Sequence, residues 1–200
     1  MSSAAAAART SEHGIDPMFF QRWSPRAFTG EEIPEATLLS FLEAARWAPS
    51  AMNAQPWRFA FARRGSAAFD RFLGVLAPAN QVWAARASAL VAIASVTSVH
   101  LPDRADPVPV ESHSFDAGAA WAQLALQAHL AGWSTHAMGG FDRARANEVL
   151  ALPPDHYLEV FVAVGRRGDP SLLPEWARLR EKPSGRRPLA DLVREGSFGA

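Results

Sequence analysis

The chain contains no cysteine and a single lysine, Lys182. The lack of cysteine excludes disulfide bonds, thiolate metal ligands and a catalytic thiol. The 20 basic and 20 acidic residues cancel to a formal net charge of zero, which argues against a broad nucleic-acid-binding or membrane-binding surface. No uninterrupted apolar stretch is long enough to cross a bilayer, and no segment is typical of an export signal. We therefore expect a cytoplasmic protein with neither a membrane nor a nucleic-acid partner.

Sequence motifs for several common chemistries are also missing. The six histidines show no paired metal-ligand spacing such as HExxH, so we expect no metal site. No G-x-G-x-x-G, G-x-x-x-x-G-K-[ST] or G-x-S-x-G segment is present. A phosphate would therefore be bound by arginine side chains rather than by a glycine-rich loop. The predominance of arginine over lysine has two explanations, biased codon usage or specific guanidinium contacts to an anion.

The 200 residues, 48% of them hydrophobic, suffice for one domain with a packed core. Periodicity and cap residues predict two helices followed by strands that are interleaved with helices. This order is typical of an α+β or mixed three-layer domain. The expected helices cover residues 18–23, 33–47, 66–76, 81–86, 115–131 and 142–150, and the expected strands cover residues 57–63, 89–99, 133–138 and 157–164.

We expect residues 1–14 to be a disordered arm and residues 15–200 to be a single domain. From about residue 168 to residue 200 the chain is proline-rich and poor in apolar residues, so it is either disordered or laid across another surface. The helix over residues 115–131 is apolar almost all the way round, and a helix without a polar face must be buried. Either a second subunit covers part of this helix or it is the central helix of a monomer.

An anion site is predicted near the N-terminus, where Arg22, Ser24 and Arg26 alternate along the chain. In an extended segment these side chains point to the same side. Two guanidinium forks and a hydroxyl then suit a phosphate, and the alternative is a solvated basic loop. A second basic pair, Arg186 and Arg187, lies near the C-terminus and has the same two interpretations.

Residues 46–57, Arg-Trp-Ala-Pro-Ser-Ala-Met-Asn-Ala-Gln-Pro-Trp, are predicted to form a loop between a helix and a strand. Pro49 ends the helix, and the loop presents amide side chains beside aromatic surface, a mixture that suits a flat, partly polar ligand. Asn53 offers a hydrogen-bond donor and an acceptor together. Gln55 offers the same pair or braces the loop backbone, and each amide has the alternative of satisfying its own turn.

A pair of glycines, Gly139 and Gly140, follows the third predicted strand. Glycine lets a ligand approach the backbone without a Cβ atom in the way, and backbone N–H groups there would stabilise negative charge. The alternative is an ordinary tight turn. His136, three residues before Gly139, is either a proton donor or a structural histidine that lines a cavity.

These four segments resemble, in the same order along the chain, the motifs of the nitroreductase family of FMN-dependent oxidoreductases. Residues 48–57 resemble its APSxxNxQPW signature, and residues 22–28 resemble its RRSxRxF motif, with Trp23 in place of the usual Arg or His. The Gly139–Gly140 turn resembles the family's flavin-lining turn. The sequence Arg-Arg-Pro-Leu at residues 186–189 resembles its closing R-K-P-L-type motif.

The resemblance implies an α+β fold with a central, mostly antiparallel sheet flanked by helices, in an intertwined homodimer. The apolar helix would form the dimer core, the C-terminal arm would embrace the partner subunit, and two FMN sites would lie at the interface. The implied reaction is a ping-pong transfer of hydride from NADPH or NADH through FMN to a small-molecule electron acceptor, which we predict to be nitroaromatic or quinone-like. No residue is assigned a catalytic role beyond the cofactor. The residues implied to bind FMN are Arg22, Trp23, Ser24, Arg26, Pro49, Ser50, Ala51, Asn53, Gln55, Met138, Gly139, Gly140, Arg186 and Arg187.

Two other functions are open at this point. The first is another chemistry of the same family, such as dehydrogenation, dehalogenation or fragmentation of flavin, and rapid turnover of a nitroaromatic would count against it. The second is flavin binding without turnover, which a bound flavin that NAD(P)H does not reduce would favour. Trp23 and the other tryptophans are compatible with a crowded flavin site and do not distinguish between these functions.

Overall fold

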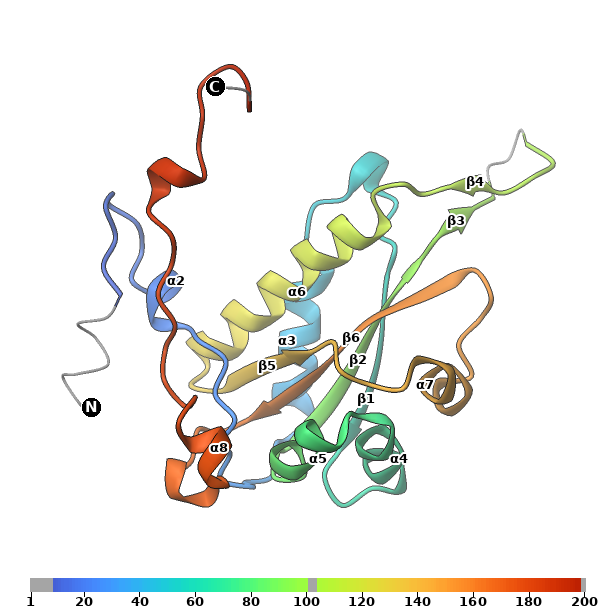
Figure 1. Ribbon diagram of the computed structural model, residues 1–200. Coiled ribbons are helices and arrows are strands. Elements are labelled where there is room, and N and C mark those ends of the chain that lie inside the picture. Colours follow the sequence, from blue (N-terminus) through green and yellow to red (C-terminus); the bar gives the residue numbers. More distant parts are fainter. Residues whose placement is uncertain (1–8, 101–103, 199–200) are drawn as a thin grey trace.

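The computed structural model describes residues 9–100 and 104–198, in which a four-stranded sheet lies between two layers of helices (Figure 1). Residues 1–8 of the expected N-terminal arm lie outside the described part. The helices are α2 (Met18–Gln21), α3 (Glu35–Arg46), α4 (Ala67–Val75), α5 (Pro78–Ala84), α6 (His113–Leu130), α7 (Arg143–Leu150) and α8 (Glu175–Arg178), with short 3-10 turns η1 (Ala51–Asn53), η2 (Pro170–Leu172) and η3 (Leu189–Asp191). The strands are β1 (Trp57–Arg63), β2 (Ala89–Val96), β3 (Ser98–Val99), β4 (Val108–Pro109), β5 (Ser134–Met138) and β6 (His156–Gly165).

The main sheet has the strand order β1-β2-β6-β5, and every neighbouring pair is antiparallel. The two central strands, β2 and β6, are runs of small and branched apolar residues, which suits strands covered on both faces. A register shift between Ile93 and Ala94 interrupts their pairing. Strands β3 and β4 form a separate hairpin. The predicted α+β class and the antiparallel sheet are therefore confirmed.

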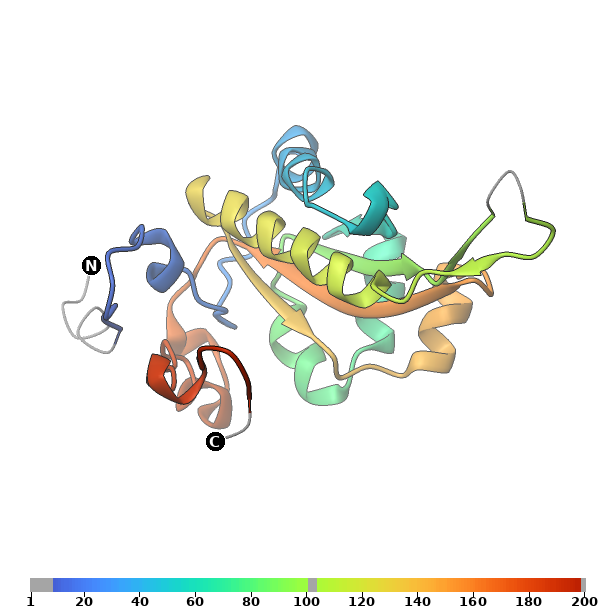
Figure 2. The same ribbon diagram turned by 90° about the horizontal axis from the view of Figure 1, so that it is seen from above.

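Alternation along β2 divides the core into two halves. Ala89, Val91 and Ile93 pack on one face of the sheet with α3 and α6, and Leu90 and Ala92 pack on the other face with α4, α5 and α7. Figure 2 shows the two helical layers on either side of the strands. Helix α6 crosses the first face and is the longest helix of the described residues.

The chain itself covers only one side of α6, which is not what the central helix of a monomer would show. Its face toward the sheet is buried through Ala120, Leu124 and Ala128. The opposite face is exposed in the single chain, with Phe115 82% and Leu130 65% exposed. The apolar sequence of α6 thus corresponds to two separate apolar faces, and the chain itself covers only one of them. The exposed or half-buried residues of the uncovered face are Phe115, Gly118, Ala119, Ala122, Leu126 and Leu130.

The predicted elements occur with shifted ends, and capping explains several of the shifts. Ser66 is an N-cap whose side chain accepts the N–H of Phe69, so α4 begins one residue later than expected. Asp142 caps α7 in the same way, as its position in the sequence predicts. Helix α5 begins at Pro78 because proline suits a first helical position. The strand predicted over residues 89–99 is divided in the structure into β2, which ends at Val96, and the short strand β3, with Thr97 between them.

The C-terminal tail after β6 runs along the outside of the domain and then away from it (Figure 1). It makes only short helical turns and exposes several large apolar side chains, of which Phe198 is 99% exposed. Residues 9–14 run beside this tail, where Glu12 accepts the N–H of Leu189. None of the helices in the described ranges is long and apolar enough to cross a membrane.

Candidate functional site

The N-terminal basic segment lies beside the C-terminal end of α6, against which α2 packs (Figure 1). Arg22 follows α2 directly, is half-buried, and donates from Nη1 to the hydroxyl of Ser24 at 3.4 Å. These two side chains therefore lie on one side of the segment, as their alternation predicts, and Trp23 between them is half-buried. Burial, followed by the charge of Arg186, lowers the pKa of Arg22.

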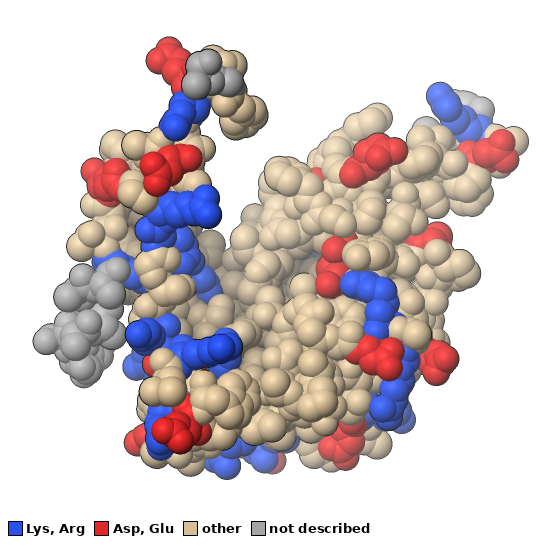
Figure 3. All heavy atoms as spheres, viewed as in Figure 1, with Lys and Arg blue, Asp and Glu red and all other residues tan. Residues whose placement is uncertain are grey.

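Arg186 reaches the same region from the C-terminal tail. Its charge also helps to lower the pKa of Arg9, which donates from Nη1 to the carbonyl of Arg22 at 2.8 Å. In the described part of the chain, no Asp or Glu forms an ion pair with any of these three arginines. Arg187 makes no hydrogen bond or ion pair to a described residue. Figure 3 shows basic side chains gathered in this part of the molecule, beside a hollow in the surface.

The basic segment is held in place from two sides. The carboxylate of Glu181 accepts the backbone N–H of Arg26 at 2.9 and 3.0 Å and that of Ala27 at 2.9 Å. On the other side, Nδ1 of His136 in β5 lies 3.0 Å from the carbonyl oxygen of Pro25. The two contacts fix the backbone of the segment, so its side chains need little reordering when an anion binds.

His136 is a neutral, structural histidine in this arrangement. Burial is the main cause that lowers its pKa to about 4, and the charges of Arg26 and Arg22 act in the same direction. At neutral pH the ring therefore carries one proton, which the Nδ1–H donates to Pro25. The ring also packs on Trp83, with centroids 4.6 Å apart. The geometry favours the structural interpretation of His136 over a proton donor, because its only proton is engaged.

The paired glycines lie at the end of β5, and both are exposed, whereas Met138 before them is buried. A Cβ atom on Gly140 would lie 3.1 Å from Nδ2 of Asn80, and that same Nδ2 donates to the Gly140 carbonyl at 3.1 Å. A Cβ on Gly139 would meet nothing within 4 Å. Sequence reasoning missed Asn80, which lies in α5, outside any motif and 60 residues from Gly140.

Strand β5 connects the basic segment to the glycine turn. His136 contacts the segment at Pro25, and Gly139 is three residues further along the chain, a distance of about 10 Å at the rise of a strand. β5 is an edge strand of the main sheet. The backbone of the basic segment and the open glycine turn are therefore both tied to β5 in one chain.

The loop over residues 49–55 stores backbone strain. Met52, Asn53 and Gln55 have φ values of 51°, 55° and 47°, a region that costs a residue with a side chain roughly 1–2 kcal/mol. The hydroxyl of Ser50 accepts the N–H of Gln55 at 3.0 Å, and Nε2 of Gln55 donates to the carbonyl of Asn53 at 3.2 Å. Gln55 thus braces the loop. The side-chain amide of Asn53 has no hydrogen-bond partner among the described residues, and it is free to meet a ligand.

The strained loop lies far from the basic segment of its own chain. The buried carboxylate of Asp116 in the first turn of α6 accepts the N–H of Ala51 at 3.2 Å and the hydroxyl of Ser112 at 2.8 Å. The basic segment lies near the last turn of the same helix, where the charge of Arg22 lowers the pKa of His129 after the larger effect of burial. The 13 residues from 116 to 129 span about 20 Å of helix. The predicted site residues therefore fall into two groups within one chain.

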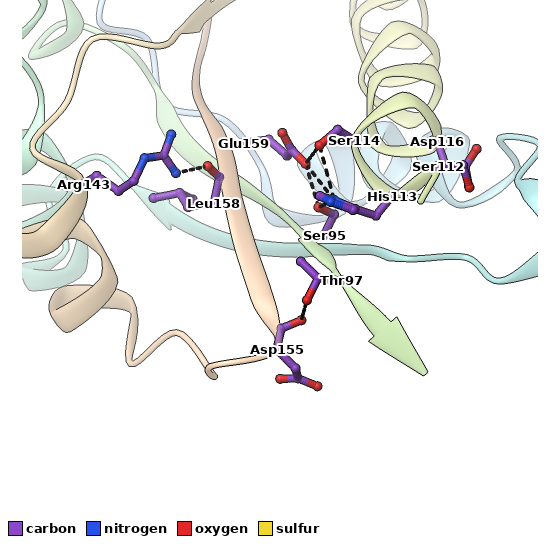
Figure 4. Close-up of polar contacts among 10 residues, drawn as sticks. All are labelled: Ser95, Thr97, Ser112, His113, Ser114, Asp116, Arg143, Asp155, Leu158 and Glu159. Atoms are coloured by element: carbon purple, nitrogen blue, oxygen red, sulfur yellow. Dashed lines mark hydrogen bonds and ion pairs between the residues drawn. The ribbon is translucent and has the colours of Figure 1, made fainter. Parts of the chain in front are cut away.

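A partly buried polar cluster lies near the N-terminal end of α6 (Figure 4). The hydroxyls of Ser95 and Ser114 donate to Oε1 of Glu159 at 2.6 and 2.8 Å, and Nδ1 of His113 lies 2.8 Å from the Ser95 hydroxyl. Since both hydroxyl protons go to Glu159, His113 acts as the donor. A hydrolytic triad needs a histidine that accepts the serine proton, and Ser95 is 0% exposed. The cluster ties β2 and β6 to α6 and is not a catalytic site.

No group of His, Asp or Glu side chains within the described ranges is arranged to hold a metal ion. The predicted site residues fall into three parts. The basic cluster contains Arg22, Ser24 and Arg186, with Arg26 beside it. The glycine turn contains Met138, Gly139 and Gly140, and the strained loop contains Pro49, Ser50, Ala51, Asn53 and Gln55.

We predict that His136 makes the protein sensitive to acid. Its pKa in the folded state, about 4, lies below the usual value of 6.5, so the unfolded chain binds the proton at a higher pH. Stability is therefore fully present above pH 6.5 and falls as the pH drops toward 4, by about 2 kcal/mol at pH 5. Urea titrations at pH 7.5 and pH 5 measure this loss.

The matched variant is His136→Asn, whose side-chain N–H can still donate to the Pro25 carbonyl but does not titrate. It should lose that part of the pH dependence. An equally steep loss of stability in the variant would contradict the assignment to His136.

The chain is similar to several known proteins. Residues 20–166 match the model of the nitroreductase family. YdgI of Bacillus subtilis (strain 168), provisionally named an NAD(P)H nitroreductase, is 27% identical over 171 residues, which cover 69% of this chain and 80% of YdgI. A crystal structure described as an oxidoreductase containing FMN is 45% identical, with a TM-score of 0.94 over 100% of this chain and 99% of that one. A provisionally named nitroreductase in complex with FMN from Desulfovibrio desulfuricans is 25% identical, with a TM-score of 0.70 over 93% of this chain and 100% of its own. The match to the family covers most of the sequence and includes both the basic segment and the glycine turn, so this chain belongs to the nitroreductase family.

Proposed function

We propose that this chain is an FMN-dependent oxidoreductase that passes hydride from NADPH or NADH to a small electron-poor acceptor, nitroaromatic or quinone-like. The observation that carries the proposal is a basic cluster without a carboxylate ion-pair partner among the described residues, on a segment that His136 ties to the same strand, β5, that ends at the open glycine turn. Relatives described as an oxidoreductase containing FMN and as an NAD(P)H nitroreductase support it.

The residues present fit an FMN molecule at both of its ends. A phosphate carries two negative charges near neutral pH, and guanidinium groups bind phosphate oxygens through paired N–H donors. Arg22 and Arg186 supply such donors, with Ser24 as a further polar contact. At the other end, Gly140 leaves room that a Cβ atom would take beside Asn80.

Each part of the site has a distinct task in this proposal. When bound, FMN supplies a two-electron centre that NAD(P)H reduces and the acceptor reoxidises in a ping-pong sequence. The exposed backbone at Gly139 and Gly140 offers N–H groups toward a ligand that gains negative charge. Asn53 offers its unpaired amide as donor and acceptor, as a pyrimidine edge requires. His136 keeps the phosphate-binding segment in register with β5 and moves no proton.

We further propose that the working form is a homodimer. The uncovered face of α6 is apolar and carries Gly118, Ala119 and Ala122 near its centre, which allow two helices to approach closely. Within one chain the strained loop and the basic cluster lie about 20 Å apart, at opposite ends of α6. If two α6 helices packed antiparallel, the strained loop of one subunit would lie beside the basic cluster of its partner. The C-terminal tail from about residue 168 would embrace the partner, which accounts for its exposed Leu192, Val193 and Phe198.

The first test is the absorption spectrum of the purified protein before and after anaerobic NADPH and NADH. We expect flavin bands that bleach with at least one nucleotide and recover when a nitroaromatic or a quinone is added. Bands that do not bleach would overturn the NAD(P)H-linked activity. A colourless protein that takes up no added FMN would overturn the proposed function as a whole.

The second test is Arg22→Ala, followed by titration of the apoprotein with FMN. A charge-assisted hydrogen bond is worth roughly 1.5–3 kcal/mol, so the dissociation constant of FMN should rise about tenfold or more. Arg71→Ala, which removes an exposed arginine of α4, is the matched control and should bind FMN as the wild type does. An unchanged FMN affinity in Arg22→Ala would remove Arg22 from the phosphate site.

The third test addresses the homodimer through Ala122→Arg, which introduces a charge at the centre of the uncovered face of α6. We expect the variant to sediment as a monomer and to lose FMN affinity, whereas the wild type has twice the mass of one chain. Ala144→Arg, at an exposed alanine of α7, is the control and should remain dimeric. A wild-type monomer that binds FMN tightly would contradict both the dimer and the shared site.

A further inference from the structure

Arg9 lies ahead of the segment that matches the family, residues 20–166, and yet it reaches the basic cluster. Its Nη1 donates to the carbonyls of Phe20 at 3.2 Å and Arg22 at 2.8 Å, and its Nε donates to the carbonyl of Ser184 at 2.8 Å. The guanidinium is therefore fixed between the N-terminal segment and the C-terminal tail. Nothing in the motifs of the sequence singles out this residue.

The three hydrogen bonds leave one side of the Arg9 guanidinium unused. Among the described residues its Nη2 has no partner, and the same is true of Nη2 in Arg22 and Arg186. The three guanidinium groups therefore carry N–H donors that no described residue accepts, and these donors can form charge-assisted hydrogen bonds to an anion.

The acidic residues nearest to this cluster along the chain do not neutralise it. Glu181 accepts backbone N–H groups of Arg26 and Ala27, and Glu12 accepts the N–H of Leu189. Neither forms an ion pair with an arginine of the cluster. Both carboxylates therefore hold the backbone in place and leave the guanidinium charges uncompensated.

Hydrogen bonds to three neutral carbonyls do not by themselves require a positive charge at position 9. Burial, then the charges of Arg186 and Arg22, lower the pKa of Arg9, so bringing it to this place works against its charged form. Neutral donors such as the amide of glutamine could bond to backbone carbonyls without that repulsion. A bound dianion would attract all three guanidinium groups and so offset the repulsion between them.

We propose that Arg9 is a third phosphate-binding arginine of the cofactor site, contributed by the N-terminal arm. The inference rests on the proposed function and assigns one further residue to it: Arg9 contributes to the affinity for FMN and not to the affinity for riboflavin, which lacks the phosphate. The same phosphate joins the two ends of the chain, because Arg9 and Arg186 approach it from the N-terminal arm and the C-terminal tail.

The test compares FMN with riboflavin, using quenching of flavin fluorescence by the apoprotein of the wild type, Arg9→Ala, Arg9→Lys and the control Arg71→Ala. We expect Arg9→Ala to raise the dissociation constant of FMN about tenfold or more and to leave that of riboflavin unchanged. Arg9→Lys keeps the charge but not the planar fork, so its FMN affinity should be intermediate. Arg71→Ala should bind both flavins as the wild type does.

Two results would overturn the role of Arg9. Equal losses for FMN and riboflavin in Arg9→Ala would show that Arg9 only holds the arms in place. Unchanged FMN affinity in Arg9→Ala would show that it does not contact the phosphate. Wild-type protein that binds neither flavin would instead overturn the proposed function, so the two failures are distinguishable.

Discussion

Helix α6 packs one apolar face on α3 and on the sheet, mainly on β2 and β5, and leaves a second apolar face uncovered. The first contact joins the helix to the sheet, and the polar cluster of Ser95, His113 and Glu159 secures its N-terminal end. The length of α6 then sets the distance between the strained loop at one end and the basic cluster at the other. Both the sheet packing and the division of the site into two groups follow from this one helix.

The basic cluster shows how a protein can hold like charges together before a ligand arrives. Mutual repulsion and burial both oppose the placement of Arg9, Arg22 and Arg186 in one region. Backbone carbonyls bind Arg9, and the carboxylates of Glu181 and Glu12 bind backbone N–H groups. Neither carboxylate forms an ion pair with these arginines, so the positive charge stays available. Neutral His136 fits the same pattern, since a second proton there would add to the repulsion.

Local patterns along the sequence carry most of the fold. The strand at Trp57–Arg63 and the helix at Glu35–Arg46 follow from alternation, periodicity and proline positions, which act over a few residues. The same is true of the basic segment and of the glycine turn. The double apolar face of α6 was visible in the sequence too, but periodicity does not say which face the chain itself covers.

The residues that sequence reasoning missed act through contacts distant along the chain. Glu181 binds the backbone 155 residues away, and Asn80 meets Gly140 across 60 residues. Arg9 is an isolated arginine in an arm expected to lack structure. The positive φ values at Met52, Asn53 and Gln55 were equally hidden, because none of these residues is glycine and strain has no local signature.

The contact between Glu181 and the backbone of Arg26 has a consequence for the order of folding. The two residues lie 155 positions apart, and the chain between them holds all four strands of the main sheet. Bringing such distant segments together costs more chain entropy than forming local contacts, so we expect this contact to form late. The sheet and its two helical layers can then assemble first, and the basic cluster is completed when the C-terminal tail closes on the N-terminal segment.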